Sequence, residues 1–315
     1  MLAIGFWLTA VICHAQGGWT ATRISSGGKD LNAVYFADTK HGWAAGDGGF
    51  FCYTEDGGVS WVERSIGTKH SVNDIYFAGK DTGFALAGGS IFETTDGGHS
   101  WREAHKFVPS EFDGATPELY SLRFNGKKRG WVVGSASRGD VITNSILAIT
   151  RDGGATWQVL QAPTRQELIH IDVVDEKRAW IVGAAGAILH TDDAGESWVR
   201  QVSDTTVTLY HVDFRNEKKG WTVGERGTIL RTDNGGLTWT KVESPGRSTL
   251  LSVQFVNDDE GWVVGRGGAI LRSIDGGRTW VEQESGTKQN LYALFMTKKN
   301  GWAVGSAGLI LRYER

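Results

Sequence analysis

Two short stretches of the sequence place a histidine two residues before an aspartate. They read IHID at 169–172 and YHVD at 210–213. If both stretches are strands, alternation puts each histidine on the same side as its aspartate. Imidazole nitrogens and carboxylate oxygens bind zinc, so the weak candidates for a metal site are His170, Asp172, His211 and Asp213. We favour the alternative, in which the imidazoles are hydrogen-bonded by neighbouring carboxylates and water, and we predict no cofactor.

A second set of carboxylates recurs in the pattern D-G-G-x-(S/T)-W. In the first copy the Asp56 carboxylate can accept hydrogen bonds from the backbone N–H groups of its own turn. Gly58 can take a conformation that a Cβ would obstruct, and Trp61 can pack back over the hairpin. We interpret these positions as structural, rather than catalytic or calcium-binding, at Asp56, Asp96, Asp152, Asp193, Asn234 and Asp275. Asparagine can stand in the fifth copy if the side chain has only to accept hydrogen bonds.

The elements that carry these residues belong to a repeat. A GW-x-VG segment comes before each turn, and its aromatic residue recurs every 40 to 49 residues, at Trp43, Phe84, Trp131, Trp180, Trp221, Trp262 and Trp302. Each copy holds four strand-sized pieces rich in Val, Ile, Leu, Tyr and Trp; in the sixth copy they are 250–255, 261–265, 269–273 and 279–283. No segment keeps a helical period. The pattern predicts an all-β fold, a β-propeller of four-stranded antiparallel blades.

The two ends of the chain complete one blade. First strands begin at seven places: Leu31, Val72, Leu119, Leu168, Leu209, Leu250 and Leu291. The seventh copy stops after its third strand, at 311–315, whereas residues 17–24 read like the fourth strand of the other copies. A blade shared by both ends leaves no open sheet edge. We therefore predict a seven-bladed propeller over residues 16–315, closed by its N-terminal strand.

Residues 1–15 do not fit the repeat. An apolar run at 2–12 is too short to span a bilayer, and Ala15 before Gln16 offers a small residue for cleavage. We predict a secretory signal peptide, and hence a secreted protein that is periplasmic, lumenal or extracellular, although the usual positive start is missing. A lipid-anchored Cys13 is the alternative, disfavoured by the large Ile12. Cleavage leaves Cys52 as the sole cysteine, so no disulfide framework is expected.

Composition limits the partners. The formal net charge of −3 argues against general nucleic-acid binding, which needs a strongly basic face. No later segment is long and apolar enough to cross a membrane. We therefore expect a monomer that does not itself span a membrane and that binds a protein.

The repeats resemble known sequences. The D-G-G turns look like the Asp-box, or bacterial neuraminidase repeat. The GW-x-VG-x-x-G-x-ILR-T spacing resembles the family of photosystem II stability and assembly factors, over essentially everything after residue 16. Photosynthetic members of that family are lumenal or periplasmic seven-bladed propellers that bind a newly made reaction-centre subunit and help to install it. The resemblance implies an assembly role without chemistry, and it does not imply a photosynthetic organism.

One face of such a propeller collects positive charge. Loops after the second and fourth strands of a blade open on the face opposite the Asp-box turns. The cations expected there are Lys29, Lys69, Arg165, Arg226, Arg247, Arg266 and Lys288. A ring of this kind would attract an acidic peptide, a carboxylate or a phosphate; the alternative is that exposed loops carry cations for solubility. Two longer loops, 107–118 and 135–144, are expected on the same face.

We predict a non-catalytic, secreted binding scaffold that docks a membrane or envelope protein through the cationic face. The rival prediction is a glycan-binding or glycoside-hydrolysing Asp-box propeller of the sialidase type. Those sialidases carry an Arg-Ile-Pro motif that this chain lacks, and no pair of carboxylates opposed across a cleft stands out. Glycan binding without catalysis would need exposed aromatic side chains on the binding rim, for which Phe107 and Phe112 are the candidates.

Overall fold

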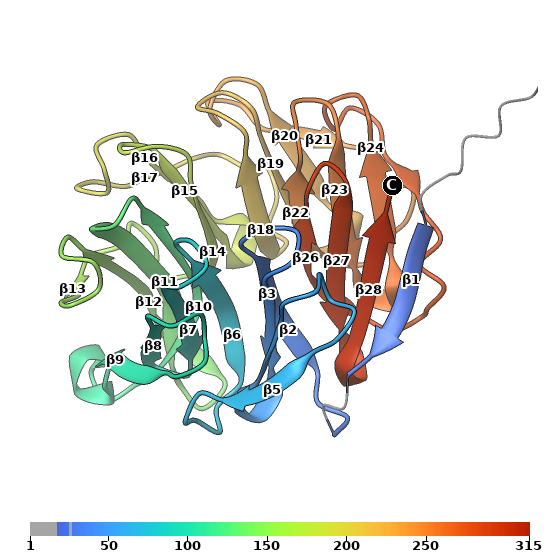
Figure 1. Cartoon of the computed structure of the whole chain (residues 1–315). Helices are drawn as coiled ribbons and strands as arrows, with labels where there is room; N and C mark the ends of the chain where they lie inside the picture. The colour runs from blue at the N-terminus through green and yellow to red at the C-terminus, as the bar shows by residue number, and fades with distance from the viewer. Residues whose placement is uncertain (1–17, 25–26) are drawn as a thin grey trace, which may run out of the picture.

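The described residues, 18–24 and 27–315 of a computed structural model, form seven four-stranded antiparallel sheets around a central axis (Figure 1). The predicted seven-bladed propeller is thereby confirmed. The expected signal peptide, residues 1–15, lies outside the described residues. In the part of the chain that is described, no helix has the length and apolar character needed to cross a membrane.

Each blade runs outward from an innermost strand next to the axis. Blades one to three contain β2 (Leu31–Phe36), β3 (Gly42–Gly46), β4 (Phe50–Thr54) and β5 (Val62–Ser65); β6 (Val72–Phe77), β7 (Gly83–Ala87), β8 (Ser90–Thr94) and β9 (Arg102–Lys106); and β10 (Thr116–Asn125), β11 (Arg129–Arg138), β12 (Val141–Thr150) and β13 (Gln158–Val159). Blades four to six contain β14 (Leu168–Val173), β15 (Ala179–Gly183), β16 (Ile188–Thr191) and β17 (Val199–Arg200); β18 (Leu209–Phe214), β19 (Gly220–Gly224), β20 (Ile229–Thr232) and β21 (Thr240–Val242); and β22 (Leu250–Phe255), β23 (Gly261–Gly265), β24 (Ile270–Ser273) and β25 (Val281–Glu282).

The seventh blade joins the two ends of the described chain. It consists of β26 (Leu291–Met296), β27 (Asn300–Gly305), β28 (Leu309–Glu314) and the N-terminal β1 (Gly18–Arg23). Strand β1 lies antiparallel beside β28 (Figure 1). Trp19 packs edge-on against Trp262, with ring centroids 5.8 Å apart, and the Ile24 N–H donates to the Gly308 carbonyl at 3.1 Å. Closure by the N-terminal strand is confirmed.

Aromatic stacking joins neighbouring blades. A buried tryptophan in the second strand of one blade stacks on the phenylalanine that ends the innermost strand of the next. The centroid distances are 3.5–3.7 Å for Trp43 on Phe77, Trp180 on Phe214, Trp221 on Phe255 and, across the closure, Trp302 on Phe36. Trp221 also donates its indole N–H to the Gly276 carbonyl in the next Asp-box turn, at 3.1 Å. These contacts fix each blade against its neighbour.

The third blade corrects two expectations. Residues 135–144 are not a long loop, because β11 and β12 continue as a paired hairpin with its turn between Arg138 and Val141. Residues 107–118 contain a short 3-10 helix, η2 (Pro109–Phe112). Phe107 and Phe112 are only 1% and 4% exposed and pack into the blade core. The aromatic side chains expected on a glycan-binding rim are therefore buried.

Candidate binding face and axial cavity

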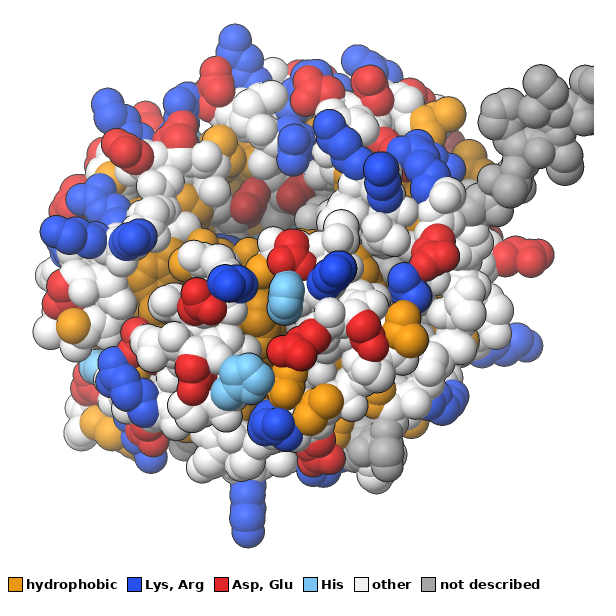
Figure 2. Space-filling model, viewed as in Figure 1, with side chains coloured by type: hydrophobic (Ala, Val, Ile, Leu, Met, Phe, Trp, Pro, Cys, Tyr) orange, Lys and Arg blue, Asp and Glu red, His pale blue; other side chains and the backbone are white. Residues whose placement is uncertain are grey.

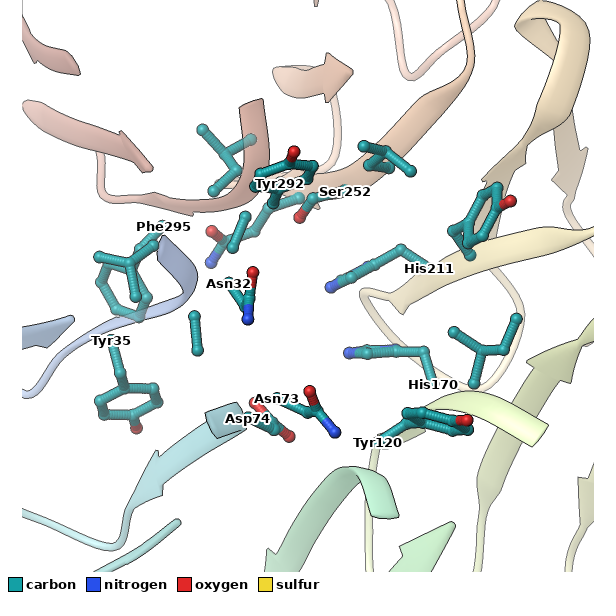
Figure 3. Close-up of a pocket in the computed structure, with 18 of the residues that line it drawn as sticks. Asn32, Tyr35, Asn73, Asp74, Tyr120, His170, His211, Ser252, Tyr292 and Phe295 are labelled. Atoms are coloured by element: carbon teal, nitrogen blue, oxygen red, sulfur yellow. The ribbon is translucent and has the colours of Figure 1, made fainter. Parts of the chain in front are cut away.

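An irregularity in every innermost strand shapes the axis of the ring. Against the second strand, the register shifts between the first and third residues of six innermost strands, and between Leu119 and Ser121, the fourth and sixth residues, of the longer β10. In β2, β14, β18, β22 and β26, the residues at the second, third and fifth positions therefore all line the axis, instead of the alternate ones expected of a regular strand; Asn73 and Asp74 of β6 and Tyr120 and Arg123 of β10 complete the lining. They enclose a cavity of about 420 Å³ (Figure 3).

Two histidines stand side by side in this cavity. The rings of His170 and His211 stack with centroids 3.6 Å apart and point into the cavity (Figure 3). The Arg123 guanidinium lies 3.0 Å from Nε2 of His170 and donates to the Asp74 carboxylate at 2.6 Å. The structure thus gives His170 a guanidinium partner, where the sequence suggested a neighbouring carboxylate.

Burial keeps both imidazoles neutral. It lowers the pKa of His170 well below its ordinary value, and the nearby His211 and Arg123 lower it further. Burial, followed by the charge of Arg123, lowers the pKa of His211 to about 3. Among the described residues, no group of three or more His, Cys, Asp or Glu side chains is placed to hold a metal ion. The four weak metal candidates line one cavity without converging on a single point.

The two aspartates of the His-x-Asp stretches act as joints between blades. Asp172 accepts a hydrogen bond from the Phe214 N–H at 2.6 Å, and Asp213 accepts one from the Phe255 N–H at 2.9 Å. Burial raises the pKa of Asp172. Burial, with the Asp172 carboxylate adding to it, raises the pKa of Asp213 to about 8. The raised pKa favours the protonated form of Asp213, which links the fifth blade to the sixth.

The carboxylate of the first Asp-box turn is hydrogen-bonded within that turn. Asp56 accepts hydrogen bonds from the N–H groups of Val59 and Ser60 and from the hydroxyls of Thr54 and Ser60, at 2.6–3.0 Å. The Ser60 hydroxyl and N–H lower the pKa of Asp56 to about 2. Gly58 has φ +84°, and a Cβ there would come 2.9 Å from the Trp302 indole nitrogen. The carboxylate stabilises the turn and has little capacity left for a ligand.

The other turns repeat this geometry. A Ser or Thr four residues later donates its hydroxyl to the aspartate at 2.5–2.6 Å in four further copies, those of Asp96, Asp152, Asp193 and Asp275. Asn234 keeps the acceptor role, since its Oδ1 accepts from the Thr238 N–H at 3.0 Å. Its Nδ2 donates to the Thr238 hydroxyl at 2.9 Å. An amide can therefore replace the carboxylate, because the amide donates the hydrogen bond to the hydroxyl that a carboxylate would accept from it.

The predicted cations lie at the opposite end of the blades. The loop after the second strand of a blade is hydrogen-bonded to the residue before the innermost strand. In the sixth blade, the Arg266 N–H donates to the Thr249 carbonyl at 2.8 Å. All seven cations are exposed. Lys29 lies with Nζ 6.0 Å from the centre of the Phe50 ring. Within the described part of the chain, the side chains of the other six make no hydrogen bond or ion pair: Lys69, Arg165, Arg226, Arg247, Arg266 and Lys288. We call this end of the propeller the loop face.

Carboxylates at the mouth of the cavity escaped the sequence interpretation. Five half-buried acids form the carboxylate collar. Asp30 and Glu167 directly precede innermost strands, Asp47 and Glu225 directly follow second strands, and Glu118 is the third residue of β10, just before Leu119. Asp47 accepts from Asn32 at 3.1 Å, and Glu118 accepts from Asn73 at 2.6 Å. At the equivalent position of the sixth blade, the first residue after β23 is a cation, Arg266. Comparing equivalent positions across all the copies would have revealed the collar.

The rest of the surface carries mixed charge. Lys and Arg side chains alternate with Asp and Glu over the side of the molecule seen in Figure 2, around a central hollow. Ion pairs away from the loop face include Lys219 with Asp258 at 2.9 Å and Arg151 with Glu196 at 2.7 Å. Exposed pairs of this kind contribute little to stability. The six cations of the loop face differ from them, because within residues 18–24 and 27–315 their side chains have no hydrogen-bond or ion-pair partner.

Sequence comparison finds one matching protein family and a relative that belongs to it by name. The model of the family described as Photosynthesis system II assembly factor YCF48 matches residues 115–207, 200–280 and 240–314. The Photosystem II assembly lipoprotein Ycf48 of Synechococcus sp. (strain CC9902) is 28% identical over 155 residues, which cover 48% of this chain and 42% of that protein. The matched segment thus spans less than half of that relative.

Solved structures share the fold. A structure of YCF48 bound to D1 peptide is 22% identical, with a TM-score of 0.77 and 96% of each chain covered. YCF48 from Cyanidioschyzon merolae is 20% identical, with a TM-score of 0.76 over 94% of this chain and 99% of that one. Virginiamycin B lyase from Staphylococcus aureus reaches 0.78 at 12% identity, over 95% and 100%. Likeness at these identities shows the fold alone. The family model matches more than half of the residues, and the chain therefore belongs to the photosystem II assembly factor YCF48 family.

Proposed function

We propose that this protein is a non-catalytic scaffold that docks a membrane or envelope protein through the loop face. The observation that carries the proposal is the set of six exposed cations at one end of the propeller, which have no hydrogen-bond or ion-pair partner among the residues that the structure describes. Unpaired guanidinium and ammonium groups form charge-assisted hydrogen bonds with carboxylates. The solved YCF48 with a bound D1 peptide supports a peptide partner by analogy.

The absence of catalysis is part of the proposal. Asp172 and Asp213, the carboxyl groups deep in the cavity, accept backbone N–H groups of the next blade and are occupied as structural joints. The Asp-box carboxylates are occupied by their own turns. The rival glycan-binding proposal needs exposed aromatic side chains on the rim, and its two candidates, Phe107 and Phe112, are buried.

Capture of the partner tests the proposal. The tagged protein is purified from its native envelope beside a variant in which Arg165, Arg226, Arg247 and Arg266 are changed to Glu. The matched control changes four exposed lysines of the opposite face to Glu: Lys40, Lys80, Lys128 and Lys218. We expect one membrane protein to be enriched by the unmodified protein and the control, and lost by the loop-face variant. Equal capture by the loop-face variant would refute docking through these cations.

Export is proposed on the same footing. The Synechococcus relative is named a lipoprotein, and for this chain we propose a cleaved signal peptide at residues 1–15 and a periplasmic, lumenal or extracellular location. Mass spectrometry of the mature N-terminus checks this. A mature chain that begins at Gln16 supports the proposal, whereas an uncleaved Met1 or a lipid-modified Cys13 contradicts it.

A further inference from the structure

A serine hydroxyl faces the axial cavity. Ser252, the third residue of β22, is 2% exposed and lines the cavity (Figure 3). Its hydroxyl makes no hydrogen bond within the described part of the chain. The hydroxyl is therefore available to a group that enters the cavity.

Two asparagines present oriented acceptors to the same cavity. Both N–H groups of the Asn32 amide are used, by the Asp47 carboxylate at 3.1 Å and the Val72 carbonyl at 3.4 Å. The Asn73 amide donates to Glu118 at 2.6 Å and to the Leu119 carbonyl at 2.9 Å. This fixes which atom of each amide is oxygen. Within the described residues neither Oδ1 has a donor, and the carboxylate behind each amide makes that oxygen a stronger acceptor.

Next to the cavity, the inner rim of the loop face carries more carboxylates than cations. Five carboxylates form the collar, and Arg266 is the cation that stands among them. Deeper in the cavity, Arg123 is neutralised by Asp74 at 2.6 Å, and the histidines are uncharged. A group that binds in the upper cavity therefore meets more negative than positive charge, which favours a cation.

Aromatic rings complete the environment. Tyr210 and Tyr292 are the second residues of their innermost strands, Tyr120 is the fifth residue of β10, and all three line the cavity. The Tyr292 hydroxyl donates to Asp30 at 2.8 Å, which holds that ring beside the collar. Across from the histidines lie Tyr35 and Phe295, with centroids 5.3 Å apart (Figure 3). Aromatic rings attract cations and pack against aliphatic chains.

We propose that the axial cavity binds an organic cation, a primary ammonium or guanidinium group on an aliphatic stem. The cationic head donates to the Asn32 and Asn73 oxygens and the Ser252 hydroxyl inside the carboxylate collar. The stem packs on Tyr35 and Phe295. A cavity of about 420 Å³ lies in the ordinary range of ligand pockets. The source is either a free amine or a Lys or Arg side chain of the docked partner, and the second source rests on the proposed function.

Calorimetric titration of the full chain with small probes tests the site. The cationic probes are N-acetyl-lysine methylamide, N-acetyl-arginine methylamide and cadaverine; the neutral and anionic comparisons are the norleucine and glutamate methylamides. We expect at least one cation to bind at least tenfold more tightly than norleucine methylamide. Binding by the amino-acid amides alone identifies a side-chain ligand, and binding by cadaverine alone identifies a free amine; both support the cation site. Equal or tighter binding of the neutral or anionic probe, or no binding by any cation, overturns it.

Neutral variants locate the site. Asp47→Asn combined with Glu118→Gln removes two collar charges and keeps an oxygen acceptor for each asparagine, so we expect cation affinity to fall at least fivefold. The matched control, Glu196→Gln with Asp258→Asn, removes two charges of the Asp-box face and should change nothing. Unaltered cation affinity in the collar variant refutes this placement. The four-arginine Glu variant of the docking experiment should keep or raise cation affinity, so failure of docking and failure of this site are separable.

Discussion

The two faces of the propeller use the same residue types in opposite ways. On the Asp-box face, Asp56 accepts four hydrogen bonds from its own turn, and Lys219 is paired with Asp258. On the loop face, Arg165 and Arg247 have no internal hydrogen bond or ion pair within the described chain. Both faces come from one repeat, so position relative to the strands decides whether a charge stabilises the fold or is available to a partner.

The largest expected effect removes an anchor of the Asp-box face. Trp221→Ala deletes a fully buried ring that stacks on Phe255 and donates to the Gly276 carbonyl, so we expect a loss of about 4 kcal/mol in the free energy of unfolding. Urea denaturation measures it. Arg247→Ala on the loop face should stay within about 0.5 kcal/mol. Similar losses for both would abolish the contrast between the faces.

A pH effect sharpens the contrast inside the ring. The pKa of Asp213 is raised to about 8 from an ordinary 3.8. The folded state then holds a proton that the unfolded state has lost, so this stabilisation is complete below pH 4 and disappears as pH rises through 8. The Asp-box carboxylates, with pKa about 2, act oppositely and lose stabilisation as pH falls from 4 to 2.

Asp213→Asn should therefore flatten the dependence of unfolding free energy on pH between 5 and 9. Denaturation curves at several pH values provide the measurement, and Asp258→Asn on the surface is the control. If the two variants keep the same slope as the unmodified protein, Asp213 is ionised in the folded state.

The smallest expected effect compares one residue from each face of the sixth blade. Asp275→Ala removes the carboxylate that accepts from the Thr279 N–H and hydroxyl, and should cost about 1 kcal/mol, as loss of a helix-capping side chain does. Arg266→Ala should cost less than about 0.5 kcal/mol. Thermal unfolding of the two variants in parallel distinguishes them. A larger loss at Arg266 would show that the loop face is also structural.

The architecture was predictable because its signals are local and repeated. Glycine, aspartate and tryptophan spacing defined the blades, and the strand missing after Arg315 had its counterpart near Trp19. Chemistry at the axis was less accessible. The register shift in each innermost strand breaks simple alternation, so Asn32 and Tyr292 face the cavity together with Ser252.

Contacts between blades also could not be predicted from the repeat pattern. Arg123 meets His170 of the next blade, 47 residues away, and Phe107 is buried by the fold of an insertion that repeats nowhere else in the described chain. The cations could be placed on one face from the blade geometry. Their binding role depends on a partner, which no residue pattern names.

The pairing of β1 with β28 has a consequence for biosynthesis. Strand β1 finds its neighbour only when Leu309–Glu314 has been made, nearly 300 residues later. Until then β1 has no strand to pair with, and the seventh blade cannot close the ring. A chain that ends before Leu309 therefore offers β1 no partner in the described fold.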